Sequence, residues 1–412
     1  MTALHISRRA ILTATAGASL PWRARAAERP VLRLGVLTDL SGPYSDTTGA
    51  GSVLGARMAA EDAMAADPSL TIEIVAGDMQ NKPDVGMSIA RQWIDREDVS
   101  AIIDVPNSAV ALAVAGLARE KNRVALFSGA ATSELTGGAC GPNHIQWTHD
   151  TYGIPNAVIK AVVGQGGTSW FFVAANYTFG AALEADSRRF VERAGGTVLG
   201  SVRYPFPETT DFSSYLLQAQ ASGAKVIGFA MSGQDVVNCV KQAAEFGIGG
   251  GRGPSIAGLA IMITTVAAIG LPAAQGMLLA EPFYWDLNDG TRAFSARFGA
   301  RNRNVMPTMN QAGCYGAVWH YLKAARTLGL AETASNGAAA VAAMKRIPTE
   351  DPLFGQGYVR ADGRVIHDIH LFRVKAPAQS HGPWDLYEHV NTVPGEDAFR
   401  PLADGGCAMV GR

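Results

Sequence analysis

The stretch VSAIIDVPNSAVALAVAGLAREKNRVALFSGA, residues 99–130, contains a complete strand–helix–strand pattern. An apolar, partly β-branched run ends at Val105, and Pro106, Asn107 and Ser108 then precede a helical segment that is apolar nearly all round. A second apolar run, NRVALF, follows. Strands that alternate with helices along the chain are typical of a parallel sheet covered by helices on both faces. The stretch therefore predicts an α/β fold.

The same alternation runs through most of the chain, in two series. The first contains the predicted strands VLRLGVLTDL and LTIEIVAGDM, which precede helices near 53–65 and 84–95. After HIQWTHDTYG a second series begins, with strands at SWFFVAAN, GTVLGSVRYP, AKVIGFAM, PSIAGLAI and GMLLAEPFYW and helices near 179–194, 211–222 and 235–246. A chain of 412 residues is also long for one core. We therefore expect two Rossmann-like lobes with parallel sheets.

The last third of the sequence predicts that the chain crosses between these lobes more than once. TMNQAGCYGAVWHYLKAARTLG is a long helical segment, and GYVRADGRVIHDIHLFRV has the pattern of a hairpin that turns at Asp362-Gly363. We expect the helix to complete lobe 1 and the hairpin to complete lobe 2. The predicted division is 30–148 plus 284–347 for lobe 1, 149–283 plus 348–400 for lobe 2, crossing hinge strands between them, and a tail at 401–412.

The first 26 residues have the features of a twin-arginine export signal. Arg8-Arg9 precede an apolar segment at 10–20 that is too short to span a membrane, and Ala24-Arg25-Ala26 fits an A-x-A cleavage site. Removing residues 1–26 takes away four of the 35 basic residues and none of the 36 acidic ones, which leaves a net charge of about −5. We expect a periplasmic protein that does not bind nucleic acid.

The four cysteines show no C-x-x-C spacing, which argues against a zinc or redox site. Export permits a disulfide, and we favour a pairing of Cys140 with Cys407, which both lie in glycine-rich segments. Cys239 and Cys314 fall in predicted helices and are expected to be small core residues.

Sequence patterns of enzymes and metal sites are absent. There is no H-E-x-x-H, no G-x-S-x-G, no Walker loop and no dinucleotide G-x-G-x-x-G after a strand. His367 and His370 would face opposite sides of a strand, so they do not predict a metal site. We expect no cofactor, no metal and no enzymatic activity, and keep an exported enzyme as the alternative from another class of function.

Small polar residues follow two neighbouring predicted strands. Ligands of open α/β sheets bind beyond the carboxyl ends of the strands, where helices begin. Asn107 and Ser108 occupy one such position, beside free backbone N–H groups that favour an anion. The next strand ends in Ser128, Gly129, Ala130, Ala131 and Thr132. Together they predict a cradle for a carboxylate, although Asn107 or Ser108 could equally serve only as a helix cap.

Apolar and aromatic residues follow the strands of the second series. Tyr177 and Phe179 come after SWFFVAAN, AMSGQDV ends a later strand with Ser232, and AIMITTV ends another with Ile261 and Met262. These rings could be packing alone. A cleft with carboxylate donors on one wall and rings on the other would suit an amphipathic acid.

From residue 31 to about 375 the chain resembles the exported type I solute-binding proteins of ABC importers, in the leucine/isoleucine/valine-binding class. The resemblance is carried by LRLGVLTDLSGPYSDTTGAGSVLGARMAAED, VAGDMQNKPDVG, FSGAATSELT, ANYTFGAALE and TTDFSSYLLQAQASGAKVIGFAMSGQD. It implies the type I periplasmic binding protein fold, ligand capture by hinge closure and delivery to permease subunits. It also implies that Ser108, Ala130 and Thr132 hold the ligand carboxylate, that Phe179 replaces a tyrosine over the ligand, and that Tyr44 lies at the cleft rim.

One departure from the family pattern concerns the ligand. Amino-acid binders of this class place an acidic residue after the strand matching PSIAGLA, whereas this loop reads Ile261-Met262-Ile263-Thr264-Thr265. An unpaired buried ammonium is costly. We therefore expect a monomer that binds an aromatic or other apolar acid without an α-amine, such as a benzoate, hydroxybenzoate or cinnamate. A branched-chain amino acid remains the alternative, with Asp235 or Asp46 as the acid. The predicted site is Tyr44, Asn107, Ser108, Gly129, Ala130, Ala131, Thr132, Tyr177, Phe179, Ser232, Ile261 and Met262.

Overall fold

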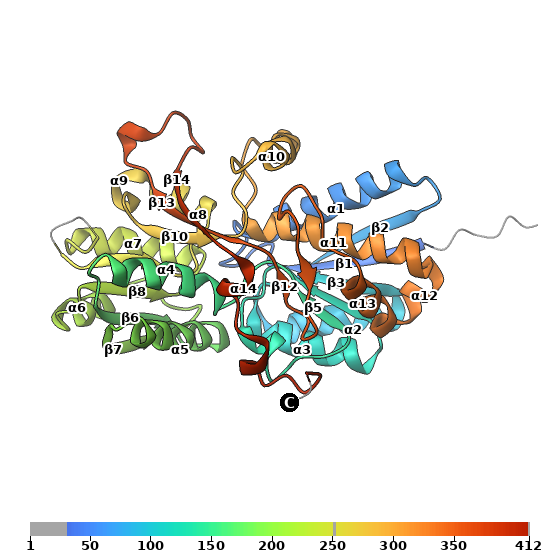
Figure 1. The fold of residues 1–412 in the computed structure, drawn as a ribbon, viewed down its shortest axis with the longest axis horizontal. Coiled ribbons are helices and arrows are strands. Elements are labelled where there is room, and N and C mark those ends of the chain that lie inside the picture. Colours follow the sequence, from blue (N-terminus) through green and yellow to red (C-terminus); the bar gives the residue numbers. More distant parts are fainter. Residues whose placement is uncertain (1–30, 250–252, 411–412) are drawn as a thin grey trace, which may run out of the picture.

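The computed structural model describes residues 31–249 and 253–410, and it divides them into two α/β lobes that lie side by side (Figure 1). The predicted export signal, residues 1–26, lies outside the described residues. Within the described ranges, no helix combines the length and the apolar character that crossing a bilayer requires.

Lobe 1 is built on a five-stranded parallel sheet of order β2-β1-β3-β4-β5. All six residues of β3 and all four of β4 are buried, which explains why these strands are apolar runs without alternation. The strands are β1 (Val31–Thr38), β2 (Thr71–Asp78), β3 (Val99–Asp104), β4 (Val124–Phe127) and β5 (His144–Gln146), and the connecting helices are α1 (Gly49–Ala66), α2 (Pro83–Arg96) and α3 (Ser108–Glu120).

Lobe 2 contains a seven-stranded sheet of order β14-β13-β10-β9-β8-β6-β7, in which β13 and β14 run antiparallel to their neighbours. The strands are β6 (Ser169–Ala175), β7 (Thr197–Tyr204), β8 (Val226–Ala230), β9 (Ser255–Gly258), β10 (Leu278–Glu281), β13 (Ile369–Val374) and β14 (Tyr387–Val393). The helices are α4 (Gly153–Gly164), α5 (Thr178–Arg193), α6 (Ser213–Ala221), α7 (Gln234–Glu245), α8 (Ile263–Ile269) and α9 (Leu271–Ala274).

After β10 the chain leaves the lobe 2 sheet and packs on α1 of lobe 1. It forms α10 (Asp289–Arg301), α11 (Met309–Leu328), α12 (Leu330–Ser335) and α13 (Gly337–Arg346). The helix α11 packs so closely on α1 that a Cβ atom at Gly55 would lie 2.3 Å from the backbone oxygen of Gln311. Two bidentate arginine–carboxylate pairs, Arg297 with Asp62 and Arg301 with Glu61, hold α10 against α1.

The hairpin at Asp362-Gly363 forms, but it does not join lobe 2. Strands β11 (Tyr358–Val359) and β12 (Val365–Ile366) pair antiparallel, and Val359 and Val365 belong to the core of lobe 1 together with Trp147. The prediction that all of 348–400 lies in lobe 2 is therefore wrong for the hairpin. Val365 packs on the lobe 1 core, whereas the next residue, Ile366, belongs to the core cluster of lobe 2 together with Ile369 of β13, so the chain crosses between the lobes within β12.

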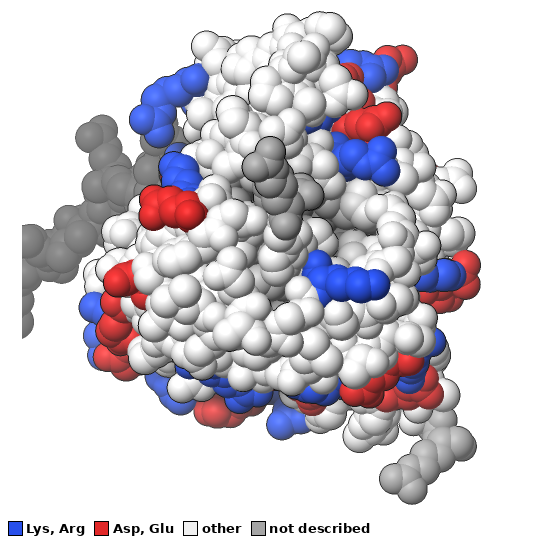
Figure 2. All heavy atoms as spheres, turned by 90° about the vertical axis from the view of Figure 1, so that its left-hand side faces the viewer, with Lys and Arg blue, Asp and Glu red and all other residues white. Residues whose placement is uncertain are grey.

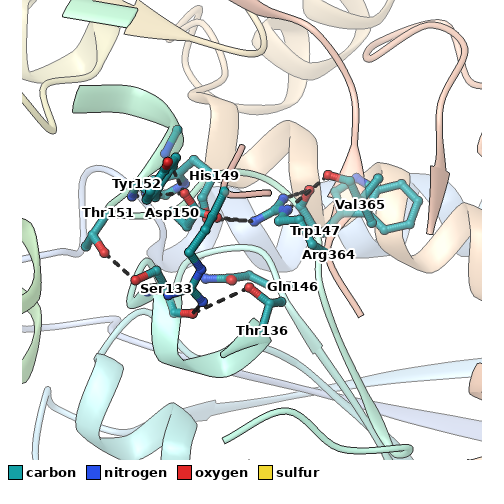
Figure 3. Close-up of polar contacts among 12 residues, drawn as sticks. Ser133, Thr136, Gln146, Trp147, His149, Asp150, Thr151, Tyr152, Arg364 and Val365 are labelled. Carbon is teal, nitrogen blue, oxygen red and sulfur yellow. Dashed lines mark hydrogen bonds and ion pairs between the residues drawn. The ribbon is translucent and has the colours of Figure 1, made fainter. Parts of the chain in front are cut away.

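A buried arginine ties two of the crossing segments together. Arg364 is fully buried, and its guanidinium donates to the backbone oxygens of Trp147 and His149, the latter at 3.1 Å, in the segment that leaves β5 (Figure 3). It also lies 4.5 Å from the centre of the Phe399 ring. These contacts fix the start of β12 against the segment between β5 and α4.

The C-terminal residues lie against lobe 1. Cys140 and Cys407 form a disulfide with a Cα–Cα distance of 5.6 Å, the pairing favoured from the sequence, while Cys239 and Cys314 are free and buried in helices. Before the tail, α14 (Gly395–Ala398) packs against α4 of lobe 2, and the tail itself contains the 3-10 turn 402–404.

The outer end of lobe 2 is largely uncharged. Figure 2 shows acidic and basic side chains intermixed along the edges of this face, without an extended basic patch among the described residues that face the viewer. Such a surface has no feature expected of a nucleic-acid interface.

Candidate functional site

A cavity lies between the two lobes, at the carboxyl ends of their parallel strands. It contains about 320 Å³ of space free of protein atoms, a figure that includes space open to solvent. Seven of the predicted site residues line it: Tyr44, Gly129, Ala131, Tyr177, Phe179, Ser232 and Met262. Six further residues complete its wall: Thr47, Thr48, Pro106, His149, Ala260 and Asn310.

Asn107 does not line the cavity, because its side chain caps α3. Its Oδ1 accepts from the backbone N–H groups of Ala109 and Val110 at 2.9 and 3.2 Å, and its Nδ2 donates to Asn81 Oδ1 at 2.7 Å. These are the bonds of an N-cap residue. The sequence did not decide whether Asn107 or Ser108 caps the helix, and the structure shows that Asn107 does.

Ser108 and Thr132 lie directly behind the cavity wall and contact each other. The backbone N–H of Thr132 donates to Ser108 Oγ at 3.3 Å, and both residues are fully buried. Ala130, also fully buried, lies between the lining residues Gly129 and Ala131. The predicted cradle residues are thus brought together by the ends of β3 and β4.

Ile261 lies in the core of lobe 2 rather than on the cavity wall. Its neighbour Met262 does line the cavity and packs with core residues of lobe 1, although it comes from lobe 2. Met262 is therefore a contact between the lobes.

The backbone turns sharply at the end of β3. Asp104 and Val105 have φ angles of 80° and 53°, a left-handed conformation that is rare for a β-branched residue. The Asp104 carboxylate accepts from Thr38 Oγ1 at 2.7 Å and Ser128 Oγ at 3.2 Å, so it joins the ends of three strands. Burial raises the pKa of Asp104 to about 6. A Cβ atom at Gly129 would lie 2.7 Å from this carboxylate, which explains the glycine there.

An aromatic cluster closes the cavity from the lobe 2 side. The hydroxyls of Tyr44, from lobe 1, and Tyr177, from lobe 2, contact each other. The Tyr177 ring stacks on Phe206 with a centroid distance of 4.5 Å and lies 5.9 Å from Phe179. Burial raises the pKa of both phenols well above the ordinary value, so both are neutral.

Two further contacts hold the lobes together. The backbone N–H of Gln234 donates to Pro43 O at 3.1 Å at the cavity rim. On another side, Ser133 Oγ of lobe 1 donates to Asp186 Oδ2 of α5 at 3.0 Å. The structure is therefore a closed form, in which both lobes contribute to one enclosed site.

The sequence analysis missed His149 and Asn310, two lining residues that each carry a buried polar atom without a partner among the described residues. Within the described chain, neither His149 Nδ1 nor Asn310 Oδ1 has a hydrogen-bond partner, although both residues are buried. Burial, with the nearby Arg364 charge, lowers the pKa of His149 to about 3, so the ring is neutral. The position of Asn310 at the start of a predicted helix was the signal that could have found it.

Of the residues that line the cavity, none is acidic. Asp235 is buried but accepts from the Tyr204 hydroxyl at 2.7 Å, and Asp46 is exposed. Neither acid proposed for an ammonium reaches the wall. The described residues also contain no group of three or more His, Cys, Asp or Glu suited to a metal ion.

Known proteins resemble this chain over nearly its whole length. The model of the periplasmic binding protein family matches residues 31–381. A periplasmic binding protein from Burkholderia mallei is 38% identical, with a TM-score of 0.87 over 92% of this chain and 99% of that one. A branched chain amino acid ABC transporter periplasmic ligand-binding protein from Burkholderia xenovorans LB400 is 39% identical, with a TM-score of 0.80 over 92% and 99%.

A more distant structure shares the fold. An ABC transporter solute-binding protein from R. palustris, in complex with 4-hydroxybenzoate, is 21% identical, with a TM-score of 0.77 over 89% of this chain and 97% of that one. Among curated proteins, none matches this chain.

Proposed function

The chain belongs to the periplasmic binding protein family of ABC transporters, and from this premise we propose that it captures a small carboxylate without an α-amine and delivers it to permease subunits. The ligand class is an aromatic or other apolar acid, such as a benzoate, hydroxybenzoate or cinnamate. Residues 1–26 would direct export by the twin-arginine route.

The observation that carries this proposal is the composition of the cavity wall. Tyr44, Tyr177, Phe179 and Met262 supply rings and apolar surface, whereas the lining residues include no Asp or Glu. A ligand ammonium enclosed there would lose its water without gaining an anionic partner, at an effective cost of several kcal/mol. An aromatic acid without an amine avoids that cost.

The ligand carboxylate is assigned to the ends of β3 and β4. In this closed form, the Thr132 N–H donates to Ser108 Oγ at 3.3 Å. A carboxylate that replaces this weak contact would accept from both the N–H and the hydroxyl. Hydrogen bonds to a charged group each contribute about 1.5–3 kcal/mol, enough to fix the orientation of the acid.

Capture is proposed to follow hinge closure. The open lobes admit the acid, and contacts with both lobes then favour the closed form. A ligand shifts this equilibrium only through its higher affinity for one state. The acid would gain lobe 2 contacts from Tyr177, Phe179 and Met262 only on closure, and the closed form would then dock on the permease.

Branched-chain amino acid binding is the second candidate. It is favoured by the 39% identical Burkholderia xenovorans relative, which is a branched chain amino acid ABC transporter periplasmic ligand-binding protein. On this reading, neutral acceptors such as Ser232 and Asn310 would have to hold the ammonium in place of an acid.

A thermal-shift screen tests the proposal. The mature protein is unfolded to strip bound ligand, refolded, and screened with benzoate, 4-hydroxybenzoate, cinnamate and coumarate beside leucine, isoleucine and valine. At about 100 times its dissociation constant, a ligand adds about 2.7 kcal/mol of stability. A shift with aromatic acids alone is expected, and a shift with leucine alone would overturn the ligand class.

A further inference from the structure

We propose that the ligand carries a hydroxyl group in addition to its carboxylate, and that Asn310 and His149 recognise it. The inference rests on the proposed function and names the ligand more closely. It starts from two residues that line the cavity, Asn310 and His149, whose Oδ1 and Nδ1 atoms are buried and have no hydrogen-bond partner within the described chain.

Asn310 is held rigidly at the first turn of α11. Thr308 and Gln311 form a capping box there, with Thr308 Oγ1 accepting from the Gln311 N–H at 3.3 Å. The same two side chains also donate to the backbone of the α1 entrance, at Thr47 O (2.7 Å) and Thr48 O (3.1 Å), and Thr47 and Thr48 line the cavity. These contacts fix the backbone that carries Asn310 at the cavity.

His149 is fixed from its backbone side. It lies in the crossing segment after β5, and its carbonyl oxygen accepts from Arg364 Nη1 at 3.1 Å (Figure 3). The residue is 3% exposed and lines the cavity. As a neutral imidazole it offers one N–H and one lone pair, but no charge to attract a carboxylate.

The chemistry of the two groups selects a hydroxyl. A carboxylate only accepts hydrogen bonds, so it cannot satisfy the acceptor Asn310 Oδ1, and neither can the edge of an unsubstituted ring. An ammonium would donate to it but would find no acid among the residues of the wall. A hydroxyl both donates and accepts, so it can serve Asn310 and His149 together.

The preference for a hydroxylated acid should be large because Asn310 and His149 are buried. A buried polar group left without a partner is destabilising, so a site of this kind disfavours an analogue that lacks the matching hydroxyl. We expect at least one hydroxybenzoate isomer to bind roughly 10- to 100-fold more tightly than benzoate.

Calorimetry on a matrix of ligands and variants tests the inference. The ligands are benzoate and 2-, 3- and 4-hydroxybenzoate, with leucine as a reference. The variants are Asn310→Leu, which removes the amide at similar volume, and His149→Phe, which keeps a ring. Ser295→Ala is the matched control, because Ser295 Oγ is another unpartnered buried polar atom of the described chain but does not line the cavity.

In the expected result, wild type and Ser295→Ala share the preference for a hydroxybenzoate. Asn310→Leu keeps its benzoate affinity within about threefold and loses most of the preference. Without ligand, Asn310→Leu should melt at least as high as wild type, because it removes a buried group without a partner. A structural role for Asn310 would instead lower the melting point. If Asn310→Leu does not fold, His149→Phe and the wild-type preference still decide the question.

Different results would overturn the hydroxyl inference and the proposed function. Equal affinities of wild type for benzoate and all three hydroxybenzoates would overturn the hydroxyl inference and leave the proposed function standing. An equal loss of affinity for all four acids in Asn310→Leu would also overturn it. Binding of leucine with no aromatic acid bound would overturn the proposed function itself.

Discussion

The hydroxyl of Tyr44, carried by lobe 1, contacts the hydroxyl of Tyr177, carried by lobe 2, at the edge of the cavity. The contact exists only in a closed form, since the two residues belong to different lobes. It therefore contributes to closure and, through closure, to ligand affinity.

Tyr177→Phe should weaken ligand binding by about 0.5–1.5 kcal/mol, the contribution of one hydrogen bond. The variant keeps the stacking on Phe206 and loses the hydroxyl. Calorimetry measures the affinity, and small-angle scattering measures the radius with and without ligand. Tyr215→Phe, in α6 and away from the cavity, is the control. Unchanged affinity in Tyr177→Phe, or no compaction of wild type at saturating ligand, would contradict the closure role.

Ser108→Ala should weaken binding of the carboxylate by roughly 1–2 kcal/mol. The matched variant is Asn107→Ala, which removes the cap of α3 and should lower the unfolding free energy by about 0.5–2 kcal/mol. Comparing calorimetry with denaturant unfolding separates the two effects. If Ser108→Ala binds the acid as wild type does, Ser108 has no part in holding the carboxylate.

The lobes could be predicted because their signals are local. Each buried parallel strand is an apolar run, and β3, α3 and β4 fall within the stretch 99–130 that shows the pattern. The placement of the hairpin could not be predicted in the same way. Val359 and Val365 pack near Trp147, which is far away in the sequence, so their lobe depends on tertiary packing.

The residues of the site that could be predicted are likewise those with a local signal in the sequence. Tyr177 and Met262 were found because they follow strand ends, the general location of ligands in α/β folds, whereas Tyr44 was implied by the family resemblance. Asn107 and Ser108 are both small polar residues at one helix start, and only hydrogen-bond geometry distinguishes the cap from its neighbour. His149 and Asn310 were missed because sequence does not show which buried polar atoms lack partners.

The disulfide between Cys140 and Cys407 should stabilise the protein by about 2–4 kcal/mol, because it closes a long loop in the unfolded chain, with a sequence separation of 267. Thiol titration of the denatured, unreduced protein should find two free groups, Cys239 and Cys314. The double variant Cys140→Ser, Cys407→Ser should melt lower, and reductant should not lower its melting point further. Four free thiols in wild type would refute the pairing.

Asp235 should make stability depend on pH. Burial raises its pKa in the folded protein to about 6, above the ordinary 3.8. The folded state therefore binds the Asp235 proton more tightly than the unfolded state does. The resulting contribution to the free energy of unfolding is fully present below pH 3.8 and is lost as the pH rises through about 6. Asp235→Asn keeps an acceptor for the Tyr204 hydroxyl and has no charge. Between about pH 4 and pH 7, the free energy of unfolding of Asp235→Asn should rise relative to that of wild type by on the order of 1–3 kcal/mol. Denaturant unfolding across that range measures the difference, and a difference independent of pH would contradict the assignment.

Met262→Glu should shift the ligand preference from acids without an amine toward amino acids. Met262 is 3% exposed, lines the cavity at the start of α8, and would place a carboxylate among the groups that face the ligand. That carboxylate would repel the proposed aromatic acid and pair with an ammonium. The affinity for leucine should therefore rise relative to the affinity for its deaminated analogue, 4-methylpentanoate. The matched variant Met262→Gln has nearly the same shape without the charge and should leave the preference as in wild type. Calorimetry with both ligands on the three proteins gives the result. If the two substitutions act alike, charge at this position does not set specificity, and the missing acid does not explain the ligand class.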